Sequence, residues 1–252
     1  MSSAFDLTGK VALVTGANTG LGQGLAVGLA AAGADIVAAG RSTPAETEAA
    51  VLALGRKFAF VPADFSRPSM AGDVAAKAET PFGPISILVN NAGTIKRNDA
   101  LDFTESDWDE VMDVNLKSVF FLSQAVARSM VAGGDGGKII NIASMLSFQG
   151  GIRVASYTAS KSGVAGLTKL LANEWAKHGI NVNAIAPGYF ATNNTDALRA
   201  DEKRNIEILG RIPAGRWGQP SDLAGAAVFL ASGASDYVHG TILAVDGGWL
   251  AR

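Results

Sequence analysis

The chain has 252 residues, of which 48% are hydrophobic and 17% are charged. This size favours a single α/β domain over residues 1–252, because such a chain can bury about three quarters of its unfolded surface in one core. The 21 basic residues are balanced by 23 acidic ones and there is no cysteine, which argues against a nucleic-acid binder, disulfide bonds and a thiolate metal site.

The first residues of the chain and its apolar runs give an expectation for the cellular location of the protein. The start MSSAFDLTGKVALVTG lacks the charged and apolar regions of a signal peptide, and no apolar run reaches the roughly 18 residues of a membrane span. These features predict a cytoplasmic protein that binds neither membrane nor nucleic acid. His178 and His239 are isolated in the sequence, so no metal is expected.

Short β-branched runs alternate with helical segments along the whole chain. The runs are apolar at consecutive positions, which predicts a doubly wound parallel sheet of about seven strands with helices on both faces. Strands are expected at 10–16, 35–40, 57–64, 85–93, 138–144, 180–188 and 241–248, and helices near 20–32, 44–55, 67–79, 105–132, 156–177 and 221–232. The more polar segment 191–215 is interpreted as a helical insert over a substrate site, with a solvated surface helix as the alternative.

A glycine-rich turn follows the first predicted strand. In LVTGANTGLGQGLAVGLAAAG, Gly16, Gly20 and Gly22 lie between a β-branched run and an apolar helical pattern. Glycines let the backbone approach a pyrophosphate, and the helix N-terminus offers it free N–H groups. The spacing TGxxxGxG departs from the commoner GxGxxG, and glycines that only tighten the turn are the alternative reading.

The end of the second strand should contact the adenosine ribose, where a carboxylate would favour NAD over NADP. The chain instead has Gly40, Arg41 and Ser42 there, while Asp35 opens that strand and so lies at the opposite edge. This favours NADP over NAD, although Arg41 could equally lie on the adenine face. Asp64, after the third strand, is a candidate for the adenine amino group or a helix N-cap.

The stretch SYTASKSG places Tyr157 four residues before Lys161, on one face of a predicted helix. A fixed ammonium beside a phenol stabilises the phenolate and would lower the tyrosine pKa by about two units. Tyr157 could then act as an acid and base near neutral pH. Ser144 ends the strand before it and could donate to a substrate oxygen, and Asn115 interrupts an apolar helix in DVNLKSVF.

Seven motifs occur in order: TGANTGLG (15–22), NNAG (90–93), Asn115, Ser144, YTASK (157–161), PG (187–188) and VDGG (245–248). Together they resemble the classical short-chain dehydrogenases/reductases over nearly the whole chain. The resemblance implies a Rossmann-like fold and hydride transfer between nicotinamide and a secondary alcohol or ketone. It implies that Tyr157 is the acid–base, that Lys161 lowers its pKa and binds the nicotinamide ribose, that Ser144 holds the substrate oxygen, and that Asn115 anchors a relay water.

The resemblance also implies a cofactor-binding set and a homotetramer. The expected cofactor residues are Gly16, Asn18, Thr19, Gly20, Leu21, Gly22, Arg41, Ser42, Asp64, Phe65, Asn91, Ala92, Gly93, Tyr157, Lys161, Pro187, Gly188 and Thr192. Apolar residues of the predicted helix 105–132 fit either a subunit interface or the core: Leu116, Val119, Phe120 and Leu122. Trp249 and Leu250 near the C-terminus are compatible with contact to a second subunit.

Two segments beside the expected site, MLSFQGGIRVA and APGYFATNNT, resemble those of dehydrogenases of deoxy sugar acids. A polyhydroxylated acid needs hydrogen-bond donors and a cation. The expected substrate residues are Ser144, Gln149, Arg153, Tyr189, Asn193 and Asn194, with Arg153 as the carboxylate partner or, alternatively, in a surface or interface ion pair. The alternatives are a gluconate 5-dehydrogenase or 3-oxoacyl-thioester reductase of the same family, or a non-catalytic nucleotide sensor.

Overall fold

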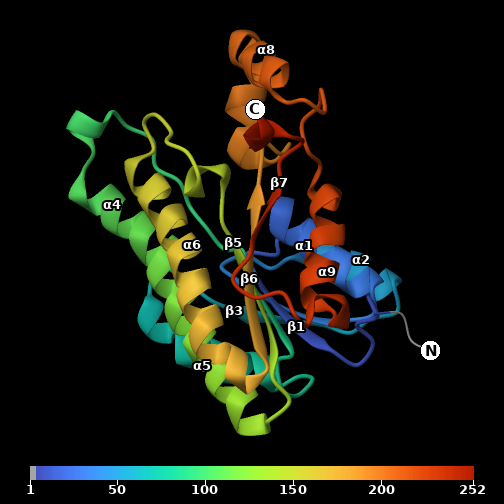
Figure 1. Ribbon diagram of the computed structural model, residues 1–252. Coiled ribbons are helices and arrows are strands. Elements are labelled where there is room, and N and C mark those ends of the chain that lie inside the picture. Colours follow the sequence, from blue (N-terminus) through green and yellow to red (C-terminus); the bar gives the residue numbers. More distant parts are fainter. Residues whose placement is uncertain (1–3) are drawn as a thin grey trace.

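One parallel sheet organises the molecule. The computed structural model describes residues 4–252 and places seven strands in the order β3-β2-β1-β4-β5-β6-β7 (Figure 1). The strands are β1 (Val11–Thr15), β2 (Asp35–Gly40), β3 (Phe58–Pro62), β4 (Ile87–Asn90), β5 (Gly137–Ile142), β6 (Ile180–Pro187) and β7 (Ile242–Val245). The strand order reverses between β1 and β4, and such switch points are where open α/β sheets bind ligands. The predicted doubly wound sheet is confirmed.

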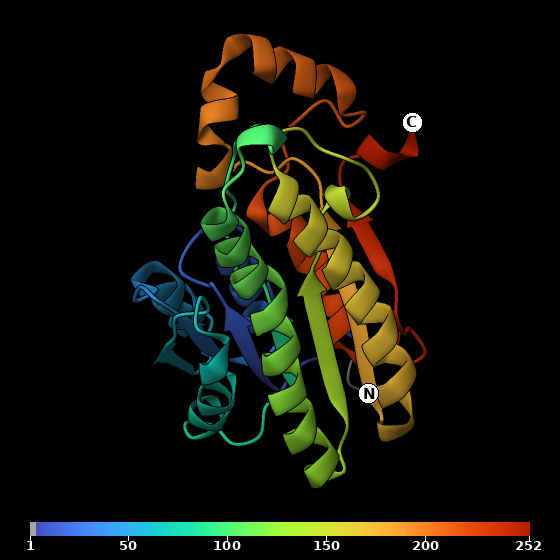
Figure 2. The same cartoon turned by 90° about the vertical axis from the view of Figure 1, so that its left-hand side faces the viewer.

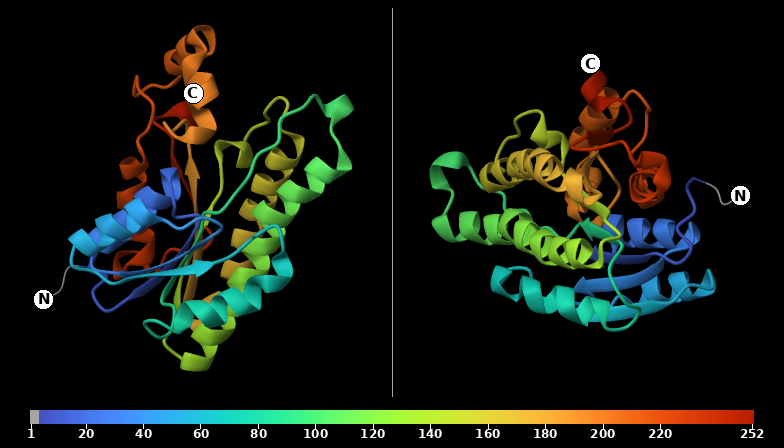
Figure 3. Two further views of the ribbon diagram at one scale, coloured as in Figure 1. Left: turned by 180° about the vertical axis from the view of Figure 1, so that it is seen from behind. Right: turned by 60° about the horizontal axis from the view of Figure 1, so that its bottom comes forward.

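Helices cover both faces of this sheet (Figures 2 and 3). One layer holds α1 (Gly20–Ala31), α2 (Ala45–Ala53) and α9 (Ala224–Ala231), and the other holds α3 (Ala71–Glu79), α4 (Glu105–Met112), α5 (Ser118–Gly133) and α6 (Ala155–Trp175). Each layer buries its own aliphatic cluster against the strands, for example Leu25 and Ile36 on one face and Leu88 and Leu122 on the other. Because both faces are covered, the strands carry apolar residues at consecutive positions.

The predicted helix 105–132 is interrupted. A π-helical turn, Asp113–Lys117, joins α4 to α5. The apolar pattern of the sequence does not reveal this turn, since every residue stays in a helical path. Val119 and Leu122 of α5 are buried in the sheet-facing core, and Phe120 packs against the same core. Val119 and Leu122 are therefore buried within the subunit, whereas Phe120 and Leu116 are only partly buried and remain candidates for either place.

Segment 191–215 is helical, as expected, and stands above the carboxyl ends of the strands (Figure 1). It contains a 3-10 turn (Asn193–Thr195), α7 (Asp196–Ala200) and α8 (Glu202–Arg211). The C-terminal turn Trp249–Ala251 packs beneath α8, where the Trp249 side chain is 4% exposed in a cluster with Ile208 and Ile212. Trp249 is thus covered by its own subunit.

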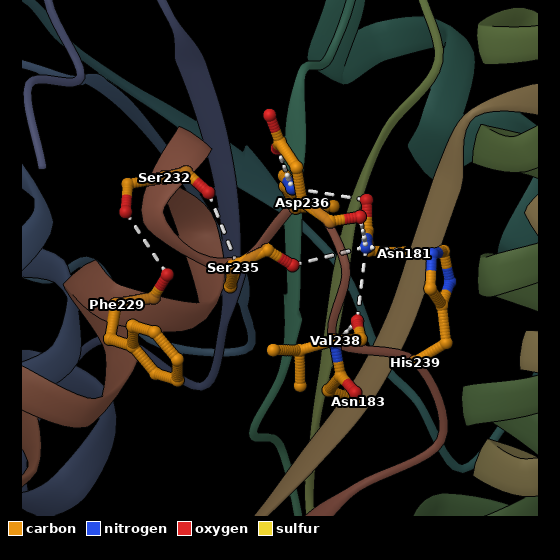
Figure 4. Close-up of polar contacts among 9 residues, drawn as sticks. Asn181, Asn183, Phe229, Ser232, Ser235, Asp236, Val238 and His239 are labelled. Atoms are coloured by element: carbon orange, nitrogen blue, oxygen red, sulfur yellow. Dashed lines mark hydrogen bonds and ion pairs between the residues drawn. The ribbon is translucent and has the colours of Figure 1, made fainter. Parts of the chain in front are cut away.

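A cluster of polar residues lies at the opposite end of the sheet, near the start of β6 (Figure 4). The Asn181 side-chain amide donates to the carbonyl oxygens of Ser235 at 3.2 Å, Asp236 at 3.0 Å and Val238 at 3.0 Å. It also lies 3.2 Å from the ring Nε2 of His239. The bonds to Ser235, Asp236 and Val238 fix the connection between α9 and β7, and His239 lies beside them. Over residues 4–252, none of the helices has the length and hydropathy needed to cross a membrane.

Candidate functional site

A cleft of about 810 Å³ opens at the carboxyl ends of the strands, at the switch point between β1 and β4. Asn115 and Pro187 do not line it, although the sequence placed both in the site. All other predicted site residues do: Gly16, Asn18, Thr19, Gly20, Leu21, Gly22, Arg41, Ser42, Asp64, Phe65, Asn91, Ala92, Gly93, Ser144, Gln149, Arg153, Tyr157, Lys161, Gly188, Tyr189, Thr192, Asn193 and Asn194.

The glycine-rich turn forms the floor of one half of the cleft. Gly16 adopts φ +65°, and a Cβ at Gly22 would lie 2.2 Å from the carbonyl oxygen of Gly16. Only glycine therefore allows the strand and helix to approach each other this closely. Helix α1 starts at Gly20, its N-cap Thr19 makes no side-chain capping bond, and its first turn has no acidic residue. Its free N–H groups suit a pyrophosphate.

The loop after β4 is fixed to this turn by Thr15. The Thr15 hydroxyl accepts hydrogen bonds of 2.9 Å from the backbone N–H groups of Asn91 and Ala92. The Asn91 side-chain amide donates to the carbonyl oxygens of Thr15 and Gly16 at 2.9 and 3.1 Å. The loop after β4 and the glycine-rich turn are thus held together by partly buried polar contacts.

The end of the cleft where the sequence predicts the adenosine carries Arg41 and Ser42, directly after β2. Asp35 opens β2 and is bound to Arg56 at 2.6 Å, so it stays at the far edge as expected. Asp64 lines the cleft and accepts hydrogen bonds from the hydroxyl and backbone N–H of Ser66, at 2.8 and 3.1 Å, which lower its pKa. Helix α3 begins only at Ala71, so Asp64 is not its N-cap.

Tyr157, Lys161 and Ser144 meet in the other half of the cleft. The Lys161 ammonium lies 5.7 Å from the centroid of the Tyr157 ring, which confirms that the two side chains share one face of α6. Lys161 also donates a 2.6 Å hydrogen bond to the carbonyl oxygen of Ile142, the last residue of β5. Ser144 follows that strand and hydrogen-bonds the Tyr157 phenol. The three polar groups converge on one point.

The protein's own groups do not lower the Tyr157 pKa as the spacing predicted. Burial raises the pKa of the phenol, and this outweighs the hydrogen bond with Ser144 and the charge of Arg97, both of which lower it. Lys161 is itself buried, and burial lowers the pKa of its ammonium to about 8. The lowering of the Tyr157 pKa by Lys161 remains a prediction, since Lys161 is not among the causes that set this direction, and the sequence spacing carries no information on burial.

The Asn115 side chain is fully buried behind the cleft. Its amide oxygen accepts from the backbone N–H of Thr94 at 2.8 Å, and its amide nitrogen donates to the carbonyl of Thr94 at 2.9 Å and to the Ser160 hydroxyl at 3.3 Å. Asn115 thus fastens the loop after β4 to the π-helical turn and to α6. The predicted water-anchoring role of Asn115 remains a prediction.

Comparison with known sequences gives the family. The profile described as short chain dehydrogenase matches residues 10–203. The chain belongs to the short-chain dehydrogenase family. It is an NAD(P)-dependent enzyme, and its fold is the Rossmann-like one that the motifs implied.

Full-length relatives of this dehydrogenase are named as sugar acid dehydrogenases. The 2-dehydro-3-deoxy-D-gluconate 5-dehydrogenase of Escherichia coli is 67% identical over 250 residues, 99% of both chains. The enzyme of the same name from Bacillus subtilis is 58% identical over 100% of this chain and 99% of its own. A crystal structure from Agrobacterium tumefaciens with bound NADP, provisionally named 2-deoxy-D-gluconate 3-dehydrogenase, has a TM-score of 0.95 and 63% identity over 100% of both chains.

The substrate half of the dehydrogenase cleft differs from expectation at Arg153. This residue precedes α6, has φ +62°, and pairs with Asp99 at 3.1 Å. The surface ion pair that the sequence left open as an alternative is the arrangement found. Gln149 accepts a 3.3 Å hydrogen bond from the Trp249 indole, and Tyr189 packs 4.7 Å from the Trp249 ring.

Sequence reasoning missed several residues of the substrate half. They come from the loop after β4, from α4 and the π-helical turn, from the loop before α6 and from the insert, and include Thr94, Ile95, Arg97, Glu110, Val114, Ile152, Leu198 and Arg204. One signal was available for Arg97, because it stands four residues after Gly93 on a loop at the carboxyl end of a strand.

Among residues 4–252, no group of three or more His, Cys, Asp or Glu side chains could hold a metal ion.

Proposed function

We propose that this dehydrogenase transfers a hydride between NADP and C5 of 2-dehydro-3-deoxy-D-gluconate, interconverting a secondary alcohol and a ketone. The observation that carries the proposal is the polar wall around Ser144 and Tyr157. Amide, hydroxyl and guanidinium groups of Gln149, Tyr189, Asn193, Asn194 and Arg97 line it. Such a wall suits a hydroxylated acid better than the long apolar chain of an acyl thioester. The names of the full-length relatives support the same substrate.

NADP is the proposed cofactor. The glycine turn and the free N-terminus of α1 offer a place for the pyrophosphate, and Arg41 with Ser42 offers donors for the 2′-phosphate. No carboxylate follows β2 to repel that phosphate, since Gly40 is followed by Arg41. The related structure from Agrobacterium tumefaciens contains NADP.

In the proposed reaction, Tyr157 moves the proton and Ser144 holds the reacting oxygen. During oxidation of the alcohol, the C5–H bond breaks and the phenolate of Tyr157 takes the hydroxyl proton; reduction is the reverse. Bound NADP supplies the hydride carrier and, when oxidised, a positive charge near the phenol. Lys161 is held by Ile142 and lies 5.7 Å from the Tyr157 ring centroid, so its remaining donors would be available to the ribose and the phenol. The positive charge of Arg97 also lowers the pKa of the Tyr157 phenol.

The experiment compares wild type with Tyr157→Phe. Wild type is expected to oxidise NADPH in the presence of the C5 ketone of 2-dehydro-3-deoxy-D-gluconate, and to do so with a larger kcat/KM than with 5-keto-gluconate or acetoacetyl thioesters. Tyr157→Phe should lose about 10²- to 10⁴-fold in kcat while binding NADPH normally. If wild type used only the acetoacetyl thioesters, the proposed sugar acid substrate would be refuted. If wild type and Tyr157→Phe had equal rates, the proposed role of Tyr157 would be refuted.

We also propose a homotetramer. Apolar side chains remain exposed on one helical layer: Trp108 on α4, Phe121 and Val131 on α5, and Leu170 on α6 are each 40–47% exposed. A neighbouring subunit would cover them. Light scattering after size-exclusion chromatography should give four times the chain mass of 25.8 kDa, and Phe121→Asp should lower it. A monomeric wild type would refute the proposal.

A further inference from the structure

We infer that Trp249, on the C-terminal turn, orients the side-chain amide of Gln149 so that the amide nitrogen donates to the substrate. Trp249 is then a positioning residue, and Gln149 is a hydrogen-bond donor in the cleft. The inference rests on the proposed function, which supplies a sugar acid with several acceptor oxygens. The oxygen concerned is not the one at C5, because Ser144 and Tyr157 hold that one.

The direction of the Gln149 amide follows from the chemistry of its partner. The indole Nε1 of Trp249 lies 3.3 Å from Oε1 of Gln149. An indole N–H can only donate a hydrogen bond, whereas an amide has one accepting oxygen and one donating nitrogen. Gln149 therefore turns its oxygen towards Trp249. Among residues 4–252 the amide nitrogen has no hydrogen-bond partner, and Gln149 lines the cleft, so this nitrogen is left for a ligand.

The backbone of Gln149 is fixed independently of Trp249. Gln149 follows the 3-10 turn Met145–Ser147, and its backbone N–H donates to the carbonyl oxygen of Met145 at 3.1 Å. The side chain is only half-buried, and a fixed backbone still leaves its rotatable bonds free. The hydrogen bond from the indole is thus the contact that selects one orientation of the amide.

Trp249 is itself held firmly. Its side chain is 4% exposed, the Tyr189 ring lies 4.7 Å from its ring centroid, and the Arg211 guanidinium lies 4.1 Å from it. Asp246 follows β7 and accepts hydrogen bonds from two backbone N–H groups of the C-terminal turn, at 2.8 and 2.9 Å. The donor is therefore in place before substrate arrives, and an amide that is already oriented loses less conformational freedom when it binds.

A second tryptophan of the same cluster provides a matched control. The Trp217 indole donates to the side-chain oxygen of Asn205 at 2.7 Å, and the Trp217 ring lies 5.5 Å from that of Tyr189. Neither Trp217 nor Asn205 lines the cleft. Replacement by Phe at either tryptophan removes one indole hydrogen bond and keeps an aromatic ring. Only at Trp249 does the lost bond orient a residue of the cleft.

The first experiment measures KM and kcat for the C5 ketone at saturating NADPH. Trp249→Phe is expected to raise KM about 5- to 10-fold and to change kcat less than about twofold, because the lost contact binds the ground state and the transition state alike. Trp217→Phe should leave KM within about twofold of wild type. An unchanged KM in Trp249→Phe, or an equal rise in both variants, would overturn the inference, since an equal rise indicates general loosening of the cluster.

The second experiment tests whether Trp249 acts through Gln149. Gln149→Met keeps the length of the side chain without its amide, and it should raise KM at least as much as Trp249→Phe does. In the Gln149→Met background, Trp249→Phe should then raise KM by less than about twofold more. A further fivefold rise in the double variant would show that Trp249 acts through another residue and would overturn the inference.

The third experiment tests the direction of the amide and does not depend on the folding of any Trp249 variant. Gln149→Glu can still accept from the indole but offers no N–H group to the substrate, so its KM should rise about tenfold or more. A wild-type KM in Gln149→Glu would show that the cleft uses an oxygen of this side chain, which contradicts the inference. Failure of wild type to use any sugar acid would instead refute the proposed function, so the two failures are distinguishable.

Discussion

Lys161 and Ile142 are joined by a 2.6 Å hydrogen bond from the side-chain ammonium to the carbonyl oxygen at the end of β5. The bond fixes a cation that is only 5% exposed. Burial of this cation is costly, and it lowers the Lys161 pKa to about 8. The position of the ammonium beside Tyr157 is therefore held at the expense of stability.

The free-energy cost of burying the Lys161 ammonium predicts how the free energy of unfolding depends on pH. Below a pH of about 8 Lys161 is protonated in both the folded and the unfolded chain, so the penalty is fully present. As the pH rises towards about 10.5, the folded protein loses this proton first and the penalty disappears. The free energy of unfolding of wild type should therefore rise, relative to that of Lys161→Met, between about pH 7 and pH 10. Urea denaturation of both proteins measures the difference, with Lys169→Met on the exposed side of α6 as control. A difference independent of pH would contradict the lowered pKa.

Asn115 should matter for stability as well as for activity. Asn115→Ala removes the partners of the Thr94 backbone N–H and carbonyl, and it should lower the free energy of unfolding by about 2–4 kcal/mol. Asn173→Ala on the exposed surface of α6 is expected to change it by less than about 0.5 kcal/mol. Chemical denaturation gives both values. Similar effects of the two substitutions would mean that the contacts of Asn115 contribute little.

Gly22 should be essential for nucleotide binding. A methyl group at this position would lie 2.2 Å from the carbonyl oxygen of Gly16, so Gly22→Ala must displace the turn and should weaken NADPH binding at least about tenfold. Gly166→Ala on α6 is the matched control, since its Cβ would meet nothing within 4 Å. Fluorescence titration with NADPH compares the two variants. Normal binding by Gly22→Ala would exclude this turn as the pyrophosphate site.

Arg41 should select the cofactor. Arg41→Asp places a carboxylate after β2, where it would repel a 2′-phosphate and accept from a 2′-hydroxyl. Affinity for NADP is expected to fall roughly tenfold or more while affinity for NAD stays the same or improves. Paired titrations with both cofactors measure this selectivity. An equal loss for both cofactors would place Arg41 on the adenine instead.

Much of this site was predictable because strand ends are visible in the sequence. Gly16, Arg41, Asn91 and Ser144 each follow an apolar run, and parallel strands bring those positions to one edge. Residues whose placement depends on irregular backbone were not predictable. Arg153 was expected either as the carboxylate partner or in an ion pair, and the sequence could not decide between them; Arg153 has a positive φ, precedes α6 and pairs with Asp99.

Burial was the other quantity hidden from the sequence. The spacing of Tyr157 and Lys161 predicts their proximity correctly, yet the pKa of each depends on how much water surrounds it. The π-helical turn at Asp113–Lys117 could not be predicted for a related reason. Its Asn115 contacts Thr94 and Ser160, which are far from it in the sequence. The local pattern of apolar residues gives no information about contacts between residues that are far apart in the sequence.

The last residues of the chain have a practical consequence for work with this enzyme. Trp249 touches Gln149, Tyr189 and the Arg211 guanidinium, and Arg252 donates to the carbonyl oxygen of Gly210 at 2.7 Å. Any segment attached after Arg252 would be separated by only three residues from Trp249, whose partners Gln149 and Tyr189 line the cleft. Kinetic measurements should therefore use protein whose carboxyl terminus is unmodified.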